Sequence, residues 1–299
     1  MKNNIQFIIK PRTANIGVAV KRILPWVKKR MVGPFIFLDE LGPSILVGPN
    51  EAVDVRPHPH IGLSTLTYLF EGKLVHRDSL GVEQVIVPGE VNWMTAGQGI
   101  SHSEREPQEV RVHERNLHGL QFWIALPLEH ENDEPSFRHY SKEEIPLVEN
   151  DSLKMTIIAG TAFDKNSELK TYSPTTFLLG NAHKTGTLNF KHVQGQEHAV
   201  YLVKGSLKVA GQVINEHEMV VFEMNSDIEV EYEAGSLFAI IGGEPFPEPR
   251  YIFWNFVSSS KEKIEEAKRA WKDRSFPQVP GERDFIPLPG DKSAVVDYP

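Results

Sequence analysis

The stretch RPHPHIGLSTLTYLFEG, residues 56–72, gives the clearest indication of the fold. Its second part, Leu63 to Phe70, is rich in β-branched and aromatic residues and ends at Gly72, as is typical of a strand that runs into a turn. Its first part separates His58 and His60 by a single proline. Side chains two residues apart in an extended chain point to the same face, so both imidazoles are expected to face one side of a sheet.

Other short apolar runs surround this stretch, and most of them end at glycine or proline. They are residues 35–38, 74–78, 85–87 and 120–126. No long helical period separates them, and their spacing suits a β-sandwich or a β-barrel. We therefore expect an all-β fold.

The second half of the chain repeats the order of turns and strands of the first. The matching pairs are Gly62 and Gly195, Tyr68 and Tyr201, and Gly72 and Gly205, all at an offset of 205 − 72 = 133, and Gly89 and His217 at 217 − 89 = 128. Such self-similarity indicates duplication. The chain is therefore expected to form two antiparallel β-barrel domains, residues 1–134 and 135–299, with the acidic segment 129–135 as the linker.

The last part of the chain changes character. Ser259 and Glu262 have the spacing of a helix capping box, and apolar residues then recur at helical spacing. We expect a short helix over residues 260–272, followed by an extended tail rich in proline and glycine.

Composition excludes several classes of function. The 299 residues carry a formal net charge of −8, which argues against general nucleic-acid binding, and the basic run 21–30 is interpreted as a solvated edge. The chain has no cysteine, so disulfides and thiolate metal sites are excluded. No window approaches the roughly 18 apolar residues of a membrane span, and the N-terminus lacks the apolar stretch of a signal peptide. We expect a cytoplasmic protein without membrane contact.

A second spaced pair accompanies the first. His102 and Glu104 are also separated by one residue, so two strands could present four ligands to one interior. Three imidazoles and a carboxylate suit one divalent ion, with Fe, Ni, Cu, Mn and Zn all open on this evidence. A purely structural site is usually closed, whereas an octahedral ion with four protein ligands keeps two positions free. The alternative is that these histidines cap loops or lie at the surface.

His76 is a weaker candidate. It lies in HRDSLG, residues 76–81, where a strand runs into a turn. One interpretation is a hydrogen-bonded turn histidine, and the other is a residue that supports the metal ligands or lines the mouth of their pocket.

The chain resembles the pirin family of the cupin superfamily. The motifs that carry the resemblance are GPFIFLDELGP (33–43), RPHPHIGLSTLTYLFEG (56–72), HRDSLG (76–81), PGEVNWMTAGQGISHSE (88–104) and LHGLQFWIALP (117–127). The resemblance implies two cupin domains of jelly-roll type and a single iron, most consistent with Fe(II), held in the N-terminal domain by His58, His60, His102 and Glu104. The two offsets place Lys191, Val193, Val230 and Tyr232 at the equivalent positions of the second half, so that half is expected to hold no metal.

The sequence also departs from the family in two places. Ser64 stands where many members have glutamate, so a contact around the ligands is expected to differ, and the segment YIFWNFVSSS (251–260) differs from the commonest family ending.

The resemblance implies two functions, and the cupin barrel itself a third. The first is a dioxygenase like the quercetin 2,3-dioxygenases, which would act on a flavonol-type aromatic substrate with dioxygen and use Glu104 as ligand and proton acceptor. The second is a non-catalytic, iron- or redox-dependent regulator that binds a transcription factor or a metabolic enzyme. The third is a metal-assisted isomerase or lyase, because a fold does not fix a function.

Overall fold

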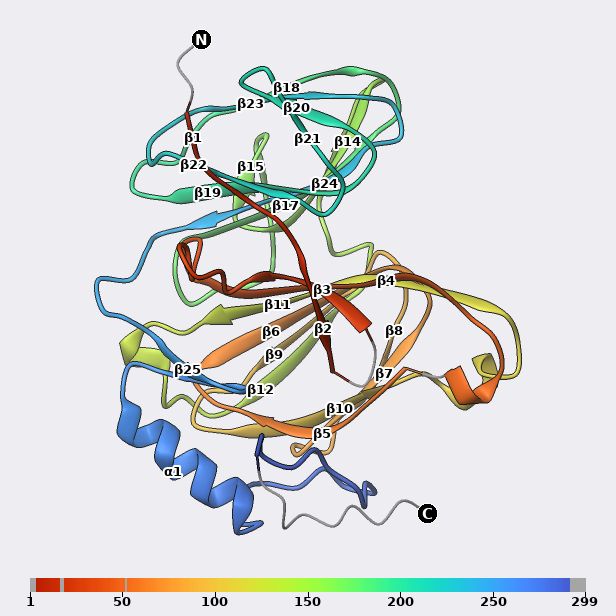
Figure 1. Ribbon diagram of the computed structural model, residues 1–299, viewed down its shortest axis with the longest axis vertical. Coiled ribbons are helices and arrows are strands. Elements are labelled where there is room, and N and C mark those ends of the chain that lie inside the picture. Colours follow the sequence, from red (N-terminus) through yellow and green to blue (C-terminus); the bar gives the residue numbers. More distant parts are fainter. Residues whose placement is uncertain (1–3, 17–18, 52, 291–299) are drawn as a thin grey trace. The chain divides into compact units, whose positions relative to one another are not determined.

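The structure is a computed structural model that describes residues 4–16, 19–51 and 53–290 (Figure 1). The chain groups into two compact units: unit 1 comprises Met1–Thr13, Lys21–Asp39 and Tyr140–Pro247, and unit 2 comprises Ala14–Val20, Glu40–His139 and Glu248–Pro299. The main change of unit lies between residues 139 and 140, near the end of the expected linker. Residues 248–299 group with the first half of the chain. The expected division into domains of residues 1–134 and 135–299 therefore remains a prediction about which parts of the chain fold independently.

Unit 2 contains most of a larger antiparallel sheet and the whole of a smaller one. The larger has the order β12 (Ser136–Tyr140), β9 (Val91–Thr95), β6 (Leu63–Glu71), β11 (Arg115–Ala125), β4 (Phe35–Leu46), β3 (Ala19–Leu24) and β2 (Arg12–Asn15). The smaller has the order β5 (Asp54–His60), β10 (Ile100–Arg105), β7 (Leu74–Asp78) and β8 (Glu83–Ile86). Single 3-10 turns lie at Pro49–Glu51, Gln108–Val110 and Leu128–His130.

Unit 1 repeats this plan. Its larger sheet has the order β1 (Ile5–Ile9), β22 (Met219–Phe222), β19 (Glu197–Lys204), β24 (Leu237–Gly243), β17 (Thr175–Ala182), β14 (Leu153–Ala159) and β13 (Leu147–Glu149). Its smaller sheet has the order β18 (Gly186–Phe190), β23 (Ile228–Tyr232), β20 (Leu207–Val209) and β21 (Gln212–Ile214). A short ribbon of β15 (Thr161–Ala162) and β16 (Lys165–Asn166) completes the strands of unit 1, whereas the ribbon of β25 (Tyr251–Phe253) and β26 (Phe256–Ser258) belongs to unit 2.

The equivalent strands follow one another in the same order in the two units. In chain order, β5, β6, β7, β8, β9, β10 and β11 correspond to β18, β19, β20, β21, β22, β23 and β24, and the sheet orders match strand for strand. The expected all-β fold with two jelly-roll domains is therefore confirmed. In the described residues the strands of each unit form two separate hydrogen-bonded sheets, which do not close into one ring.

The interior of unit 2 changes from polar to apolar along β6. Thr65 and Thr67 occupy the inner face of this strand, and Leu69 continues that face into an apolar cluster with Leu74 and Ile86. The interior of unit 1 is filled throughout by a larger apolar cluster. Only unit 2 thus offers a polar interior in the described part of its barrel-like core, and this is where the candidate ligands lie.

The expected helix is present as α1 (Lys261–Lys272). Its N-cap is Ser260, whose hydroxyl accepts the backbone N–H of Lys263 at 3.3 Å, so the expected cap at Ser259 was one residue too early. The apolar face of α1 packs Ile264 and Trp271 against Phe256 within unit 2. In the described residues, no helix has the length and apolar character needed to cross a membrane.

Candidate metal centre

The candidate ligands lie on two neighbouring strands, β5 and β10 (Figure 1). These strands pair so that His102 lies opposite His58 and Ile100 lies opposite His60. The register shifts between His102 and Glu104, because β5 contains an extra residue there, as in a β-bulge. The alternation of side chains along the strands turns these candidate ligands inward, as the spacing of the two pairs predicted.

The three histidines converge. Their ligand atoms all lie within 4.8 Å of one another, and the Nε2 atoms of His60 and His102 are 3.1 Å apart. The side chains are 6 %, 0 % and 1 % exposed for His58, His60 and His102. Within the described part of the chain, this is the one group of three or more histidine and acidic side chains with such convergence.

Hydrogen bonds on the far side of two rings orient the nitrogens. The Nδ1 atom of His58 is 2.8 Å from the carbonyl oxygen of Arg56, and that of His60 is 3.2 Å from the carbonyl oxygen of Asn255. A carbonyl can only accept, so both Nδ1 atoms carry the proton and both Nε2 atoms keep a lone pair for an ion.

The histidines are also in the protonation state that a ligand requires. Burial lowers the pKa of His58 to about 4 and lowers the pKa values of His60 and His102 well below the ordinary value. All three are therefore neutral near pH 7. A buried set of neutral imidazoles whose lone pairs converge fits a divalent metal ion.

Glu104 lies two residues beyond His102 on the same strand, outside the group of three histidines. Its Oε1 atom accepts a hydrogen bond from the Thr67 hydroxyl at 3.1 Å, and burial raises its pKa. The same hydroxyl is 2.8 Å from the Gln121 side-chain oxygen, although it has only one proton to donate. When Glu104 is ionised, the amide of Gln121 must turn its nitrogen toward Thr67 so that the hydroxyl proton is free for the carboxylate.

His76 supports His102 from behind. It lies within β7, not in the following turn, and its Nδ1 is 3.3 Å from the Nδ1 of His102. Its Nε2 is 3.0 Å from Asp78, whose other oxygen accepts the backbone N–H groups of Leu80 and Val82. These contacts favour the role of His76 as a support of the candidate ligands over that of a hydrogen-bonded turn histidine.

The chain of contacts fixes the tautomer of His102. An ionised Asp78 can only accept, so Nε2 of His76 carries the proton and its Nδ1 accepts one from Nδ1 of His102. The Nε2 of His102 is then left with its lone pair on the side of the other two histidines.

Asp78→Asn is expected to weaken metal binding by about 10–100-fold. The asparagine amide can donate toward His76, which moves the histidine proton to Nδ1 and in turn places the proton of His102 on the nitrogen that faces the ion. The measurement is the dissociation constant of the metal in competition with a chromogenic chelator. Asp133→Asn is the matched control, because Asp133 also pairs with a histidine, His130, at 2.7 Å but lies outside the centre. Equal affinity for both variants would contradict the proposed chain of hydrogen bonds.

Ser64, which departs from the family pattern, is fully buried, and its hydroxyl lies 3.0 Å from that of Thr95 on β9. It occupies the face of β6 opposite Thr65 and Thr67. The side chain at this position therefore points away from the histidines, and the expected change of contact is with β9.

The strand pairing of unit 1 corrects one expectation about the second half. On β23, Val230 and Tyr232 pair with Leu188 and Gly186 of β18. Lys191 and Val193 lie beyond the end of β18, in the connection to β19, whereas His58 and His60 lie within β5, so the constant offset of 133 misplaced both equivalents.

Within β18, the side chains of Leu188 and Phe190 face the interior of unit 1. The constant offset failed because residues 191–196 connect β18 to β19, whereas residues 61–62 connect β5 to β6. Leu188 and Phe190, together with Val230 and Tyr232 of β23, are all buried in the apolar core of unit 1.

A groove of about 540 Å³ lies elsewhere in unit 2. Its walls include Gly97, Gln98, Lys263 and Ala267, and none of the three histidines is among its lining residues. We therefore do not assign this groove to the metal centre.

Comparison with known proteins agrees with this architecture. Residues 17–124 match the model of the Pirin family, and residues 178–277 match that of the Pirin C-terminal cupin domain. The chain is 44 % identical to a pirin-like protein of Caulobacter vibrioides over 95 % of this chain and 99 % of the other. It is 35 % identical to a protein of Pseudomonas aeruginosa named as a candidate quercetin 2,3-dioxygenase, over 89 % of this chain and 83 % of that one.

A solved structure extends the comparison to three dimensions. A quercetin 2,3-dioxygenase from Acinetobacter baumannii superimposes with a TM-score of 0.88 at 35 % identity, covering 98 % of each chain. The duplicated jelly-roll architecture, the two family models and these relatives together place the chain in the pirin family.

Proposed function

We propose that this protein is a mononuclear metal-dependent dioxygenase that acts on a flavonol-type, quercetin-like substrate. The observation that carries the proposal is the convergence of three buried, neutral histidines in the polar interior of unit 2. The likeness to quercetin 2,3-dioxygenases over nearly the whole chain supports the choice of substrate class.

The proposed ligands are His58, His60, His102 and Glu104. This donor set combines imidazole with carboxylate, and we propose Fe(II) as the resident ion, with Ni, Cu, Mn and Zn as the alternatives. Held by these residues, the ion would supply Lewis-acid activation of a substrate with two adjacent oxygens and would promote its reaction with dioxygen.

Side chains around the proposed metal ion would shape the surroundings of the substrate and accept its proton. A flavonol must lose its hydroxyl proton to chelate an ion, and burial raises the pKa of Glu104 toward the range of a proton acceptor. Thr67 holds the carboxylate by its hydrogen bond. Trp123 packs edge-on against His60 with ring centroids 5.1 Å apart, and Phe137 stacks on His76 at 4.4 Å, so aromatic rings shield the histidines from water.

The test is turnover by protein loaded with each candidate ion. Anaerobic addition of quercetin is expected to perturb the absorption spectrum of the bound metal or of the substrate, and admission of air is expected to release carbon monoxide as dioxygen is consumed. His102→Ala, treated identically, is the control and should do neither.

Two outcomes would contradict the proposal. Absence of carbon monoxide with every ion tested would exclude a quercetin dioxygenase. Conversion of a substrate in the absence of dioxygen would instead identify an isomerase or lyase.

A further inference from the structure

A segment near the C-terminus covers the outer face of β5 and β10, the two strands that carry the proposed ligands. Residues 276–288, which we call the C-terminal strap, run along β5 and β10 within unit 2 (Figure 1, dark blue). Because side chains alternate, the residues of β10 that face this strap are those that alternate with the proposed ligands His102 and Glu104. The strap therefore contacts the same two strands as the metal, but from the opposite side.

Three successive outward residues of β10 each bind the strap. The Ser101 hydroxyl donates to the carbonyl oxygen of Pro277, and the Ser103 hydroxyl donates to Glu282 at 2.9 Å. Arg105 forms a two-pronged pair with Glu282, at 2.9 and 2.7 Å, and reaches Asp284 at 2.8 Å. Such bidentate, charge-assisted pairs fix the orientation of both partners.

The carboxylate of Glu282 is held in its charged form. Burial alone would raise its pKa, but the hydrogen bonds from Arg105 and Ser103 outweigh burial and the pKa is lowered. The side chains of Arg105 and Glu282 are 19 % and 12 % exposed, so this pair is largely sheltered from solvent.

The strap also binds β5 at its irregularity. The register of β5 and β10 shifts between His102 and Glu104, and a bulge leaves part of the ladder unpaired. The backbone N–H of Ile286 donates to the carbonyl oxygen of Pro57, inside this irregular stretch, at 2.8 Å. Ile286 is itself tied to α1, since its carbonyl oxygen accepts the Trp271 indole N–H at 2.9 Å.

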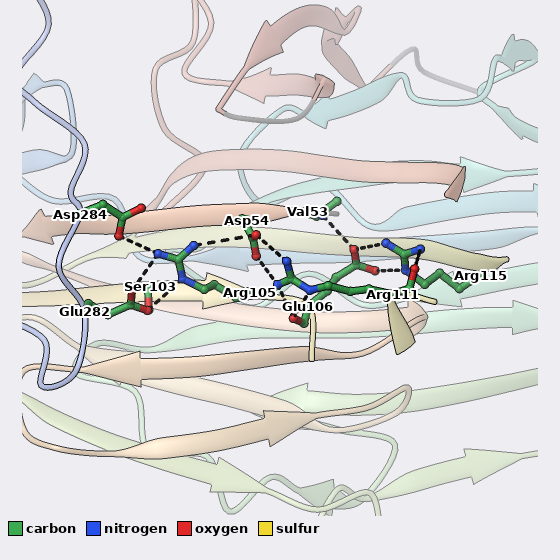
Figure 2. A network of polar contacts seen from close by, with 9 residues as sticks. All are labelled: Val53, Asp54, Ser103, Arg105, Glu106, Arg111, Arg115, Glu282 and Asp284. Carbon is green, nitrogen blue, oxygen red and sulfur yellow. Dashed lines mark hydrogen bonds and ion pairs between the residues drawn. The ribbon is translucent and has the colours of Figure 1, made fainter. Parts of the chain in front are cut away.

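Figure 2 shows how much of the charge balance the strap supplies. Three arginines and four carboxylates form one continuous network, and two of the four carboxylates belong to the strap. The remaining neighbour of Arg105, Asp54, lies 3.9 Å away and already makes two shorter hydrogen bonds with Arg111. Without the strap, Arg105 would therefore lose its close partners.

We propose that the C-terminal strap sets the geometry of the metal centre from outside, with Arg105 and Glu282 as its positioning residues. The pair holds β10 in register on the bulged β5, so that His102 stays opposite His58 and Glu104 stays opposite Val55, with both side chains on the inner face. This inference rests on the proposed metal centre and does not depend on which substrate the protein takes.

The test compares Glu282→Gln with the wild-type protein, using Co(II) as a spectroscopic probe of the full chain. The substitution keeps the size of the side chain and removes its charge. We expect about 10–100-fold weaker Co(II) binding, faster loss of Co(II) to a chelator and an altered visible spectrum. The matched control is Glu83→Gln, which breaks the two-pronged Arg77–Glu83 pair on the same sheet and should leave all three properties unchanged.

Unchanged Co(II) affinity and spectrum in Glu282→Gln would overturn the proposal, as would equal losses in the Glu83 control. If the Glu282 variant fails to fold, Asp284→Asn carries the same test with a smaller expected loss, because it removes only one partner of Arg105. His60→Ala separates this inference from the metal centre: if that variant retains Co(II), the centre itself is misplaced, whereas loss of Co(II) there with none in Glu282→Gln rejects the strap alone.

Discussion

Replacing His60 by alanine is expected to abolish stoichiometric metal binding. The substitution removes a side chain that is 0 % exposed, whose Nε2 faces His102 at 3.1 Å and whose Nδ1 is held by the carbonyl oxygen of Asn255. Loss of a group that merely supports a ligand costs about 10–100-fold in metal affinity, so loss of a ligand should cost more. The measurement is metal analysis of protein purified without chelators or metal-affinity resins, with His58→Ala examined in parallel.

A buried histidine outside the centre provides the control. His198 on β19 of unit 1 is 3 % exposed, and burial lowers its pKa to about 4, as for His58. His198→Ala creates a comparable cavity but removes no proposed ligand, so its metal content should equal that of the wild type. Full occupancy in both His60→Ala and His58→Ala would refute the assignment of the ligands. Equal loss in all three variants would mean that the losses reflect damage to the fold.

Local spacing explains why the histidines could be found from the sequence. Residues two apart on a strand share a face whatever the strand packs against, so the pairs at 58/60 and 102/104 carried their geometry with them. The strand β6 and the helix α1 were predictable for the same reason, since their patterns repeat at the period of the element.

The contacts that support the proposed metal centre could not be predicted from the sequence, because they join residues that lie far apart along the chain. His76 could be assigned a role only once β7 was known to lie beside β10, 26 residues further along the chain. The carboxylates of the strap lie 177 residues or more from the strand that they hold. The failure of the constant offset at Lys191 has a similar cause, since loop lengths change between duplicated domains while strand pairing is kept.

The misplaced helix cap follows the same logic. Ser259 has the composition and spacing of an N-cap, but its backbone N–H and hydroxyl both donate to Glu131, at 2.8 and 2.9 Å. The cap therefore moves to Ser260. Glu131 is 128 residues away from Ser259, so only the folded chain reveals that this carboxylate competes for the serine.

Glu131→Gln is expected to lower the free energy of unfolding of unit 2 by about 3–5 kcal/mol. The side chain of Glu131 is 1 % exposed and lies 3.1 Å from the guanidinium of Arg250, which is 0 % exposed. Removing the carboxylate charge takes a buried ionic partner away from this arginine, whose guanidinium also donates to the carbonyl oxygen of Leu126. Urea unfolding followed by tryptophan fluorescence measures the loss, because four of the five tryptophans lie in unit 2.

The matched control is Glu248→Gln. Glu248 is a second carboxylate near Arg250, but it lies 3.8 Å away with its side chain 49 % exposed, so its loss should cost only about 0–1 kcal/mol. Similar small losses for both variants would contradict a dominant role for the buried pair. The difference between the two losses of unfolding free energy measures how much burial strengthens a carboxylate contact to Arg250, because water can take the place of the exposed Glu248 carboxylate but not that of the buried Glu131 carboxylate.

Glu131 also accepts hydrogen bonds from the hydroxyls of Ser258 and Ser259. The Glu131→Gln substitution should therefore loosen the chain at the start of α1, and hydrogen exchange there should rise more in Glu131→Gln than in Glu248→Gln.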